Sequence, residues 1–132
     1  MSGMPLLLDT TVLIDVLRDR PAAARVDALL DAREIPYICA VTAEEVMRGL
    51  RPGEHGRANR LVAGFKVAPL RVIEGALAGT WRREYAERGI TLQQSDCLIA
   101  AAAAGIRATL ATGNPKHFPM DLVTVEHWPV GA

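Results

Sequence analysis

Hydrophobic and polar positions divide this chain into two kinds of segment. Short apolar runs, such as residues 5–8 and 37–41, carry no charge and are typical of strands buried on both faces of a sheet. Between them, hydrophobic residues recur every three or four positions, as one face of a helix requires. The pattern predicts strands at residues 5–8, 37–41, 66–72, 106–111 and 122–126. It predicts helices at residues 11–18, 22–33, 42–49, 51–65, 73–88 and 95–104.

Strands that alternate with helices indicate an α/β fold. Right-handed crossovers place the connecting helices on both faces of a parallel sheet. We therefore expect a three-layer α/β/α sandwich with a parallel sheet of four to five strands. A length of 132 residues suits one domain, so residues 1–132 are expected to form a single domain with its own core.

The overall charge gives no direct indication of a partner. Fifteen basic residues balance fifteen acidic ones, so binding to nucleic acid would need a local patch. The N-terminus has no basic segment, and nowhere do about 18 uncharged apolar residues follow one another. We expect a cytoplasmic protein with no membrane partner. Cys39 and Cys97 lack metal-binding spacing and are expected to be buried thiols.

Four polar residues are expected at one edge of the predicted sheet. Asp9 ends the first strand, Glu45 and Asp96 lie near the starts of two helices, and Asn114 follows the fourth strand. In a parallel sheet, the carboxyl ends of the strands and the starts of the following helices share one edge. The sequence therefore predicts that these four side chains lie close together.

Carboxylates that converge in a cleft repel one another, and a cation is needed to neutralise them. Oxygen ligands without a thiolate or imidazole cluster suit Mg²⁺ or Mn²⁺. Such an ion can polarise a phosphodiester and activate a bound water. The pattern therefore favours metal-dependent phosphodiester hydrolysis.

Structural roles are open alternatives for each acid. Thr42 and Glu45 have the spacing of a capping box, and Asp96 beside Ser95 could be favoured by a helix start whatever the function. Asp9 could cap the next helix, although Thr10 or Thr11 could do the same. Asp15 is expected to be solvated or paired with a cation.

Three segments carry a resemblance to a known family: LLLDTTVLID, VTAEEVMRGL and SDCLIAAAAAGIRATLATGNPKHF. In this order and spacing, the chain resembles the PIN-domain family and specifically VapC-type toxins of toxin–antitoxin modules. The resemblance implies a PIN-like fold and an endoribonuclease that uses Mg²⁺ or Mn²⁺. It also implies a homodimer and inhibition by a small cognate antitoxin of the VapB type.

The resemblance assigns roles to individual residues. The family's metal-binding acids match Asp9, Glu45 and Asp96. Its polar residues around the site match Thr10, Thr112 and Asn114, of which Asn114 would orient a ligand or the scissile phosphate.

His117 stands where the family often places a fourth acid. Neutral imidazole could ligate a metal or bond to phosphate but brings no negative charge, and a surface histidine is the alternative. A single ion is therefore expected.

Substrate binding would need cations near the acids. The segment from Arg48 to Arg60 is rich in arginine, with Arg51 and Arg57 between, and Lys116 lies beside His117. These residues are candidates for phosphate contacts, for antitoxin binding, or for a solvated helix face.

Two other functions remain open: a receiver-like phosphoacceptor domain and a catalytically silent binding module. A receiver domain would need an acid pair after the first strand, and here Thr10 follows Asp9. Haloacid-dehalogenase chemistry needs Asp-x-Asp, which DTT lacks.

Overall fold

The structure is a computed structural model that describes residues 3–131 of the chain. Its centre is a parallel sheet of five strands in the order β3-β2-β1-β4-β5. The strands are β1 Leu6–Leu8, β2 Tyr37–Ile38, β3 Lys66–Val67, β4 Thr109–Thr112 and β5 Thr124–His127.

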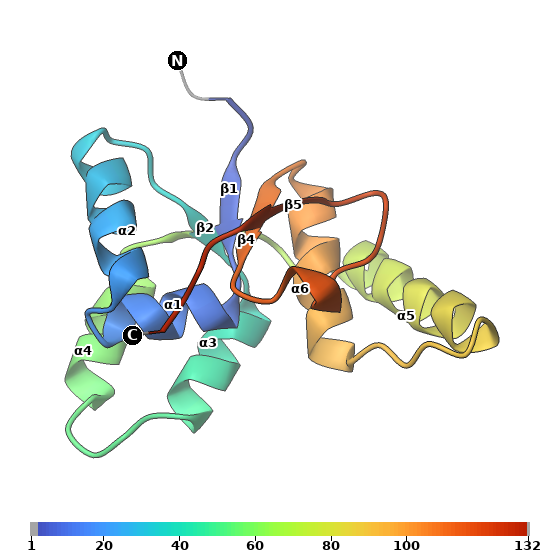
Figure 1. Ribbon diagram of the computed structural model, residues 1–132, viewed down its shortest axis with the longest axis horizontal. Coiled ribbons are helices and arrows are strands. Elements are labelled where there is room, and N and C mark those ends of the chain that lie inside the picture. The colour runs from blue at the N-terminus through green and yellow to red at the C-terminus, as the bar shows by residue number, and fades with distance from the viewer. Residues whose placement is uncertain (1–2, 132) are drawn as a thin grey trace.

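Helices cover both faces of this sheet, which confirms the predicted three-layer α/β/α sandwich. The helices are α1 Thr10–Leu17, α2 Pro21–Asp31, α3 Ala40–Arg48, α4 His55–Ala63, α5 Val72–Glu87, α6 Gln94–Gly105 and the short 3₁₀ helix η1 Pro115–His117. Figure 1 shows α1 to α4 on one side of the sheet and α5 with α6 on the other. None of the helices within residues 3–131 is long and apolar enough to cross a lipid bilayer.

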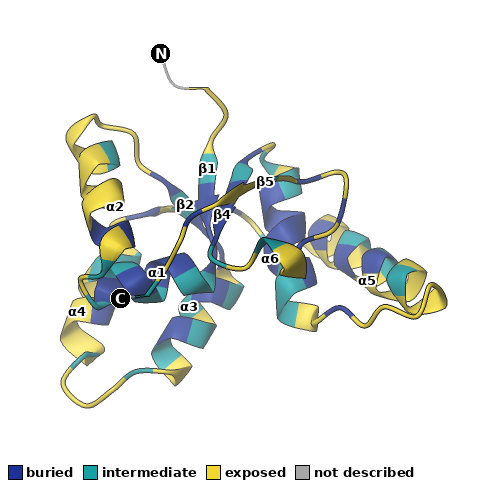
Figure 2. Cartoon of the chain, viewed as in Figure 1, coloured by how far each residue is buried: buried dark blue, intermediate teal, exposed yellow. Residues whose placement is uncertain are grey.

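Alternate residues of the central strands supply two separate cores. Leu7 and Leu110 pack with α5 and α6, whereas Leu8, Ile38 and Ala111 pack with α1 to α4. Side chains of a strand point to opposite faces in turn, so a sheet covered on both faces needs uninterrupted apolar strands. Figure 2 shows the burial of these central strands beneath the exposed outer faces of the helices.

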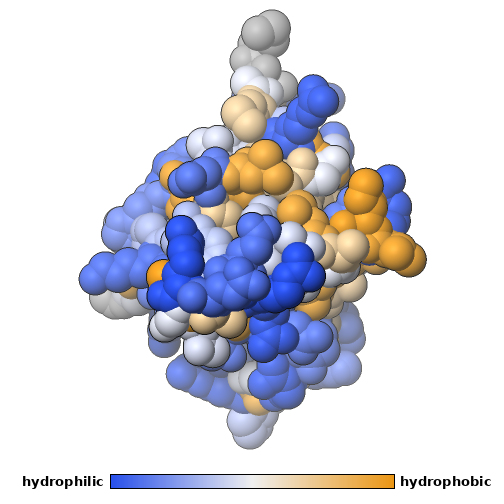
Figure 3. All heavy atoms as spheres, turned by 90° about the vertical axis from the view of Figure 1, so that its right-hand side faces the viewer, coloured by the Kyte–Doolittle hydropathy of each residue, from blue (hydrophilic) through white to orange (hydrophobic). Residues whose placement is uncertain are grey.

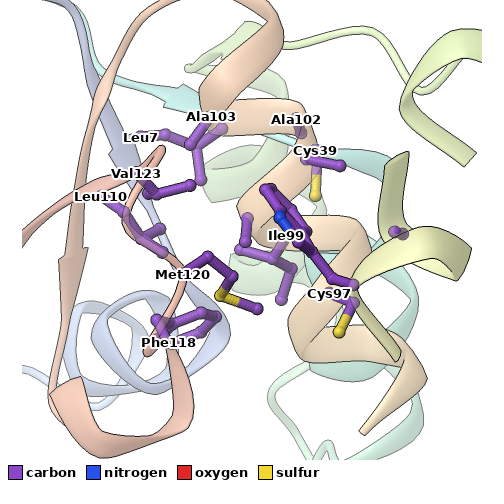
Figure 4. Packing of buried hydrophobic residues seen from close by; sticks show 14 of the residues in the cluster. Leu7, Cys39, Cys97, Ile99, Ala102, Ala103, Leu110, Phe118, Met120 and Val123 are labelled. Atoms are coloured by element: carbon purple, nitrogen blue, oxygen red, sulfur yellow. The ribbon is translucent and has the colours of Figure 1, made fainter. Parts of the chain in front are cut away.

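The alanine-rich helix α6 lies close against the sheet. Its residues Ala100–Ala103 are buried, and Ile99 fills the space beside Met120 and Phe118 (Figure 4). Small side chains allow the helix backbone to approach the strands closely, which fixes the position of the first turn of α6 at the sheet edge. Cys39 and Cys97 are both buried free thiols, as predicted.

The strand order contradicts the receiver-like alternative. Receiver domains have the order 2-1-3-4-5, whereas here β1 lies between β2 and β4. The sheet edge at which β1 and β4 end is therefore built differently from the phosphoacceptor site of a receiver domain.

All five predicted strands differ from the observed strands in at least one boundary, and β1 begins one residue later than predicted, at Leu6. β3 ends at Val67 because Pro69 follows and cannot donate a ladder hydrogen bond. β4 begins only at Thr109 because Arg107 has a left-handed backbone with φ of 54°, and it continues to Thr112. β5 is shifted by two residues at its start and begins at Thr124.

The predicted capping box of Thr42 and Glu45 is wrong. β2 ends at Ile38 and α3 begins at Ala40, with Cys39 as an N-cap whose side chain makes no capping bond. Thr42 is therefore buried within the helix, and Glu45 lies in the second turn rather than the first. Its carboxylate is free of a capping role.

The prediction that Asp15 is solvated or paired is also wrong. Asp15 is 2% exposed, and its carboxylate accepts from the amides of Ala22 at 2.8 Å and Gly131 at 2.9 Å. It joins α1 to the start of α2 and to the end of the chain, which lies beside α1 in Figure 1. Asp15 is thus a structural residue of the fold.

We expect Asp15→Ala to lower the free energy of unfolding by about 3 kcal/mol, because two amides lose a charged acceptor. Asp15→Asn should cost less, since its amide oxygen still accepts a hydrogen bond. Urea denaturation measures both, with Asp27→Ala on the exposed face of α2 as control. An Asp15→Ala protein within about 0.5 kcal/mol of wild type would contradict the assigned role.

Candidate functional site

Asp9 lies at the junction of β1 and α1 and is 3% exposed. Its Oδ1 accepts from the Val12 amide at 3.1 Å and from the Thr11 hydroxyl at 2.6 Å, while Oδ2 accepts from the Thr112 hydroxyl. Asp9 is thus the N-cap of α1, and the interpretation that gave this role to Thr10 or Thr11 is wrong. A carboxylate offers about four acceptor positions, so one remains open on Oδ2.

Burial raises the pKa of Asp9 above its ordinary value of 3.8, and the hydrogen bonds from Thr11, Thr112 and the Val12 amide oppose this rise. Each of these donors stabilises the ionised form. The site therefore holds a desolvated carboxylate whose charge is only partly compensated by the protein's own dipoles.

Glu45 approaches the site from α3. Its Oε1 accepts from the Thr10 hydroxyl at 2.5 Å, and Thr10 also contacts the Thr42 hydroxyl at 3.5 Å. Thr10 belongs to the first turn of α1, directly after Asp9. Two adjacent residues at the start of α1 thus position two carboxylates. The Asp9 carboxylate is held as the N-cap of the helix, and the Glu45 carboxylate is held by the Thr10 hydroxyl.

Asp96 enters from the first turn of α6, as predicted. The N-cap of this helix is Gln93, and no side chain makes a capping bond there, so Asp96 is not needed as a hydrogen-bonded cap. Burial raises the pKa of Asp96, the negative charges of Glu45 and Asp9 raise it further, and His117 lowers it. Glu45 and Asp9 therefore lie near enough to act on the charge of Asp96.

The acids are close but do not form a closed ligand cage. Within residues 3–131, no three Asp, Glu, His or Cys side chains lie close enough together to bind one ion directly. A small ion that keeps several of its waters can bridge such a gap, as Mg²⁺ usually does. The all-oxygen character of the three side chains fits Mg²⁺ or Mn²⁺.

The loop after β4 is tied to the start of α1 by Thr11 and Gly113, which the sequence analysis did not single out. The Gly113 amide donates to the Thr11 hydroxyl at 2.9 Å, and the Asn114 amide donates to the Thr112 hydroxyl at 2.9 Å. A Cβ on Gly113 would stand 2.6 Å from Val130 Cγ2. In the sequence, this close approach was indicated by a glycine that stands between two predicted site residues, Thr112 and Asn114.

The predicted cations do not all reach the acids. The Arg48 guanidinium lies 3.0 Å from Glu44 Oε2 and 3.9 Å from Glu45 Oε2, so it borders the site. Lys116 is exposed on η1, one residue before His117. The remaining arginines of the predicted patch lie exposed in the α3–α4 turn or on α4: Arg51, Arg57 and Arg60.

A hollow between α3 and α6 adjoins one of the acids, Glu45. Its volume is about 410 Å³, and Arg48 and Ser95 are also among its lining residues. The Glu45 carboxylate and the Arg48 guanidinium therefore border the same open surface.

Comparison with known proteins agrees with the geometry. The model of the PIN domain family matches residues 6–119. Ribonuclease VapC10 of Mycobacterium tuberculosis is 37% identical over 117 residues, which cover 87% of this chain and 86% of the relative.

Solved structures have the same fold. VapBC2 from Rickettsia felis, bound to a DNA fragment from its promoter, superposes with a TM-score of 0.82 at 20% identity and covers 95% of this chain and 99% of that one. A toxin–antitoxin complex from Klebsiella pneumoniae has a TM-score of 0.71 at 26% identity, with coverage of 90% and 95%.

We expect Thr112→Val to raise the pKa of Asp9 further, because the ionised carboxylate loses a hydroxyl donor. Since the folded pKa of Asp9 already exceeds 3.8, its ionisation opposes folding; this penalty grows as the pH rises from 3.8 through the folded pKa and is constant at higher pH. A carboxyl ¹³C NMR titration measures the shift. Thr109→Val on the same strand is the control, and an unchanged Asp9 midpoint in Thr112→Val would contradict the network.

Proposed function

The chain belongs to the PIN-domain family, and from this premise we propose that it is a metal-dependent endoribonuclease that acts as the toxin of a toxin–antitoxin module. The observation that carries the proposal is the convergence of three acids from distant segments at one sheet edge: Thr10, next to Asp9, holds Glu45, and the charges of Glu45 and Asp9 both raise the pKa of Asp96. Carboxylates gathered in this way need a cation nearby to offset their charge.

Asp9, Glu45 and Asp96 would hold one Mg²⁺ or Mn²⁺ ion, in part through waters that the ion keeps. The ion would offset two of the three negative charges and would lower the pKa of a coordinated water toward neutrality. The fit rests on the donors: all three side chains present oxygen, and Asp9 retains one open acceptor position.

The other residues of the site would keep these acids in place. Thr10 holds Glu45 through its hydroxyl, and Thr112 holds Asp9. Asn114 is the exposed N-cap residue of η1, and its backbone amide donates to the Thr112 hydroxyl. The Asn114 side chain would donate to a phosphate oxygen. Each of these side chains would hold its partner in position in the bound complex without a large movement of its own.

RNA would lie along the hollow between α3 and α6. Arg48 borders this hollow, and its exposed pair with Glu44 is weakened by the surrounding water, so a phosphate could replace Glu44. Lys116 on η1 and Arg51 after α3 would add further phosphate contacts. The net charge of zero makes this local placement of cations necessary.

We further propose two protein partners: a small antitoxin of the VapB type and a second copy of this chain. The likeness to the Klebsiella pneumoniae toxin–antitoxin complex supports the first. The second is supported by exposed apolar side chains at the start of α5, where Val72 is 89% and Ile73 is 66% exposed. Figure 3 shows this side of the molecule, with hydrophobic areas between hydrophilic ones.

Purified protein should cleave RNA in the presence of Mg²⁺ or Mn²⁺ and lose at least about 100-fold in rate in Asp96→Asn, because one charged ligand is removed. The rate of cleavage of a defined RNA, with and without EDTA, measures this. Asp27→Asn, an exposed acid on α2, is the control and should leave the rate within about twofold.

Thermal unfolding of the same variants separates catalysis from stability, since Asp96 caps no helix through its side chain. Absence of cleavage by wild type with either ion, or an Asp96→Asn rate equal to wild type, would contradict the proposal. In cells, wild type should arrest growth, Asp96→Asn should not, and co-expression of the adjacent small reading frame should relieve the arrest.

A further inference from the structure

His117 approaches Asp96 from a different part of the chain. Its Nδ1 lies 3.5 Å from Asp96 Oδ2, and the two residues belong to η1 and to the first turn of α6. The Asp96 side chain is 19% exposed and that of His117 is 55% exposed. The imidazole is therefore the more exposed member of the pair.

The separation is longer than a usual hydrogen bond and leaves room for a shared ion. Hydrogen bonds from nitrogen to oxygen are usually about 2.7 to 3.2 Å long. Two neighbouring ligand atoms on an octahedral ion with bonds of about 2.1 Å stand about 3 Å apart. A movement of a few tenths of an ångström would bring both atoms to that spacing.

The backbone around His117 is well fixed. The His117 amide donates to the Asn114 carbonyl at 3.0 Å, and the next amide, of Phe118, donates to the Pro115 carbonyl at 3.0 Å. Phe118 itself is 4% exposed and belongs to the core beside α6. The core therefore anchors η1 next to Asp96.

We propose that His117 supplies a nitrogen ligand to the ion that Asp96 holds, and that this ligand gives the site a preference for Mn²⁺ over Mg²⁺. The inference rests on the proposed function and specifies its cofactor. Mg²⁺ favours oxygen ligands, whereas imidazole binds first-row transition ions. A fourth carboxylate in this position would favour Mg²⁺ by charge, and neutral imidazole brings none.

Electron spin echo envelope modulation of bound Mn²⁺ tests the ligand directly, because a coordinated imidazole gives ¹⁴N modulation. We expect this modulation in wild type and in His55→Ala, and its loss in His117→Ala. His55 is an exposed histidine at the start of α4 and serves as the matched control. By calorimetry, His117→Ala should weaken Mn²⁺ binding about tenfold and Mg²⁺ binding less than about twofold.

His117→Asp supplies the reverse test. It restores a fourth acid, so Mg²⁺ should bind more tightly than in wild type and the ratio of Mn²⁺ to Mg²⁺ affinity should fall. This variant remains informative if His117→Ala folds poorly.

The outcomes distinguish the inference from the proposed function. Bound Mn²⁺ without ¹⁴N modulation, or modulation that survives His117→Ala, overturns the role of His117 and leaves the nuclease proposal standing. Loss of the ¹⁴N modulation in His127→Ala, rather than in His117→Ala, would also overturn the role of His117. His127 is the alternative ligand because it pairs with Thr112 across the sheet. Failure of wild type to bind any Mn²⁺ or Mg²⁺ overturns both.

Discussion

The burial of the Asp9 carboxylate is the constraint on which the rest of the site depends. A desolvated negative charge at the end of β1 needs donors, and the chain supplies them from the first turn of α1 and from Thr112 at the end of β4. The same contacts therefore orient α1 and join two neighbouring strands at their carboxyl ends. Because one acceptor position on Oδ2 stays open, the carboxylate is held in place without being fully satisfied.

The other parts of the site extend this arrangement. Thr10 follows Asp9 directly and holds Glu45, so the entry into α1 also fixes the α3 side of the site. The alanine face of α6 brings Asp96 to the sheet edge by close packing rather than by a polar contact. The hydrophobic core thus holds Asp96 near the charges of Asp9 and Glu45, and a divalent cation would offset most of the negative charge gathered there.

The sequence predicted what depends on periodicity. The apolar runs indicated the parallel sheet, and the shared edge of such a sheet indicated that Asp9, Glu45 and Asp96 lie near one another. It did not predict where β2 ends, because Tyr37 to Val41 is apolar throughout and only the packing of α3 decides that Ala40 is helical. A pattern of hydrophobicity alone does not distinguish a buried strand from the start of a buried helix.

Residues whose role depends on distant contacts were also missed. Asp15 looked like a surface acid on a helix, but its two amide partners come from the next helix and from the end of the chain. Gly113 matters because Thr11 and Val130 pack against it, and these lie far away in the sequence. Local propensity contains no information on such contacts. In contrast, Thr10 could be recognised in the sequence because it directly follows Asp9.

We propose that three acids from separate segments share one divalent ion. Anomalous diffraction from crystals grown with Mn²⁺ locates such an ion. We expect a single anomalous peak between the carboxylates of Asp9, Glu45 and Asp96, lost in crystals of Asp9→Asn. A peak remote from these side chains, or none at saturating Mn²⁺, would contradict it.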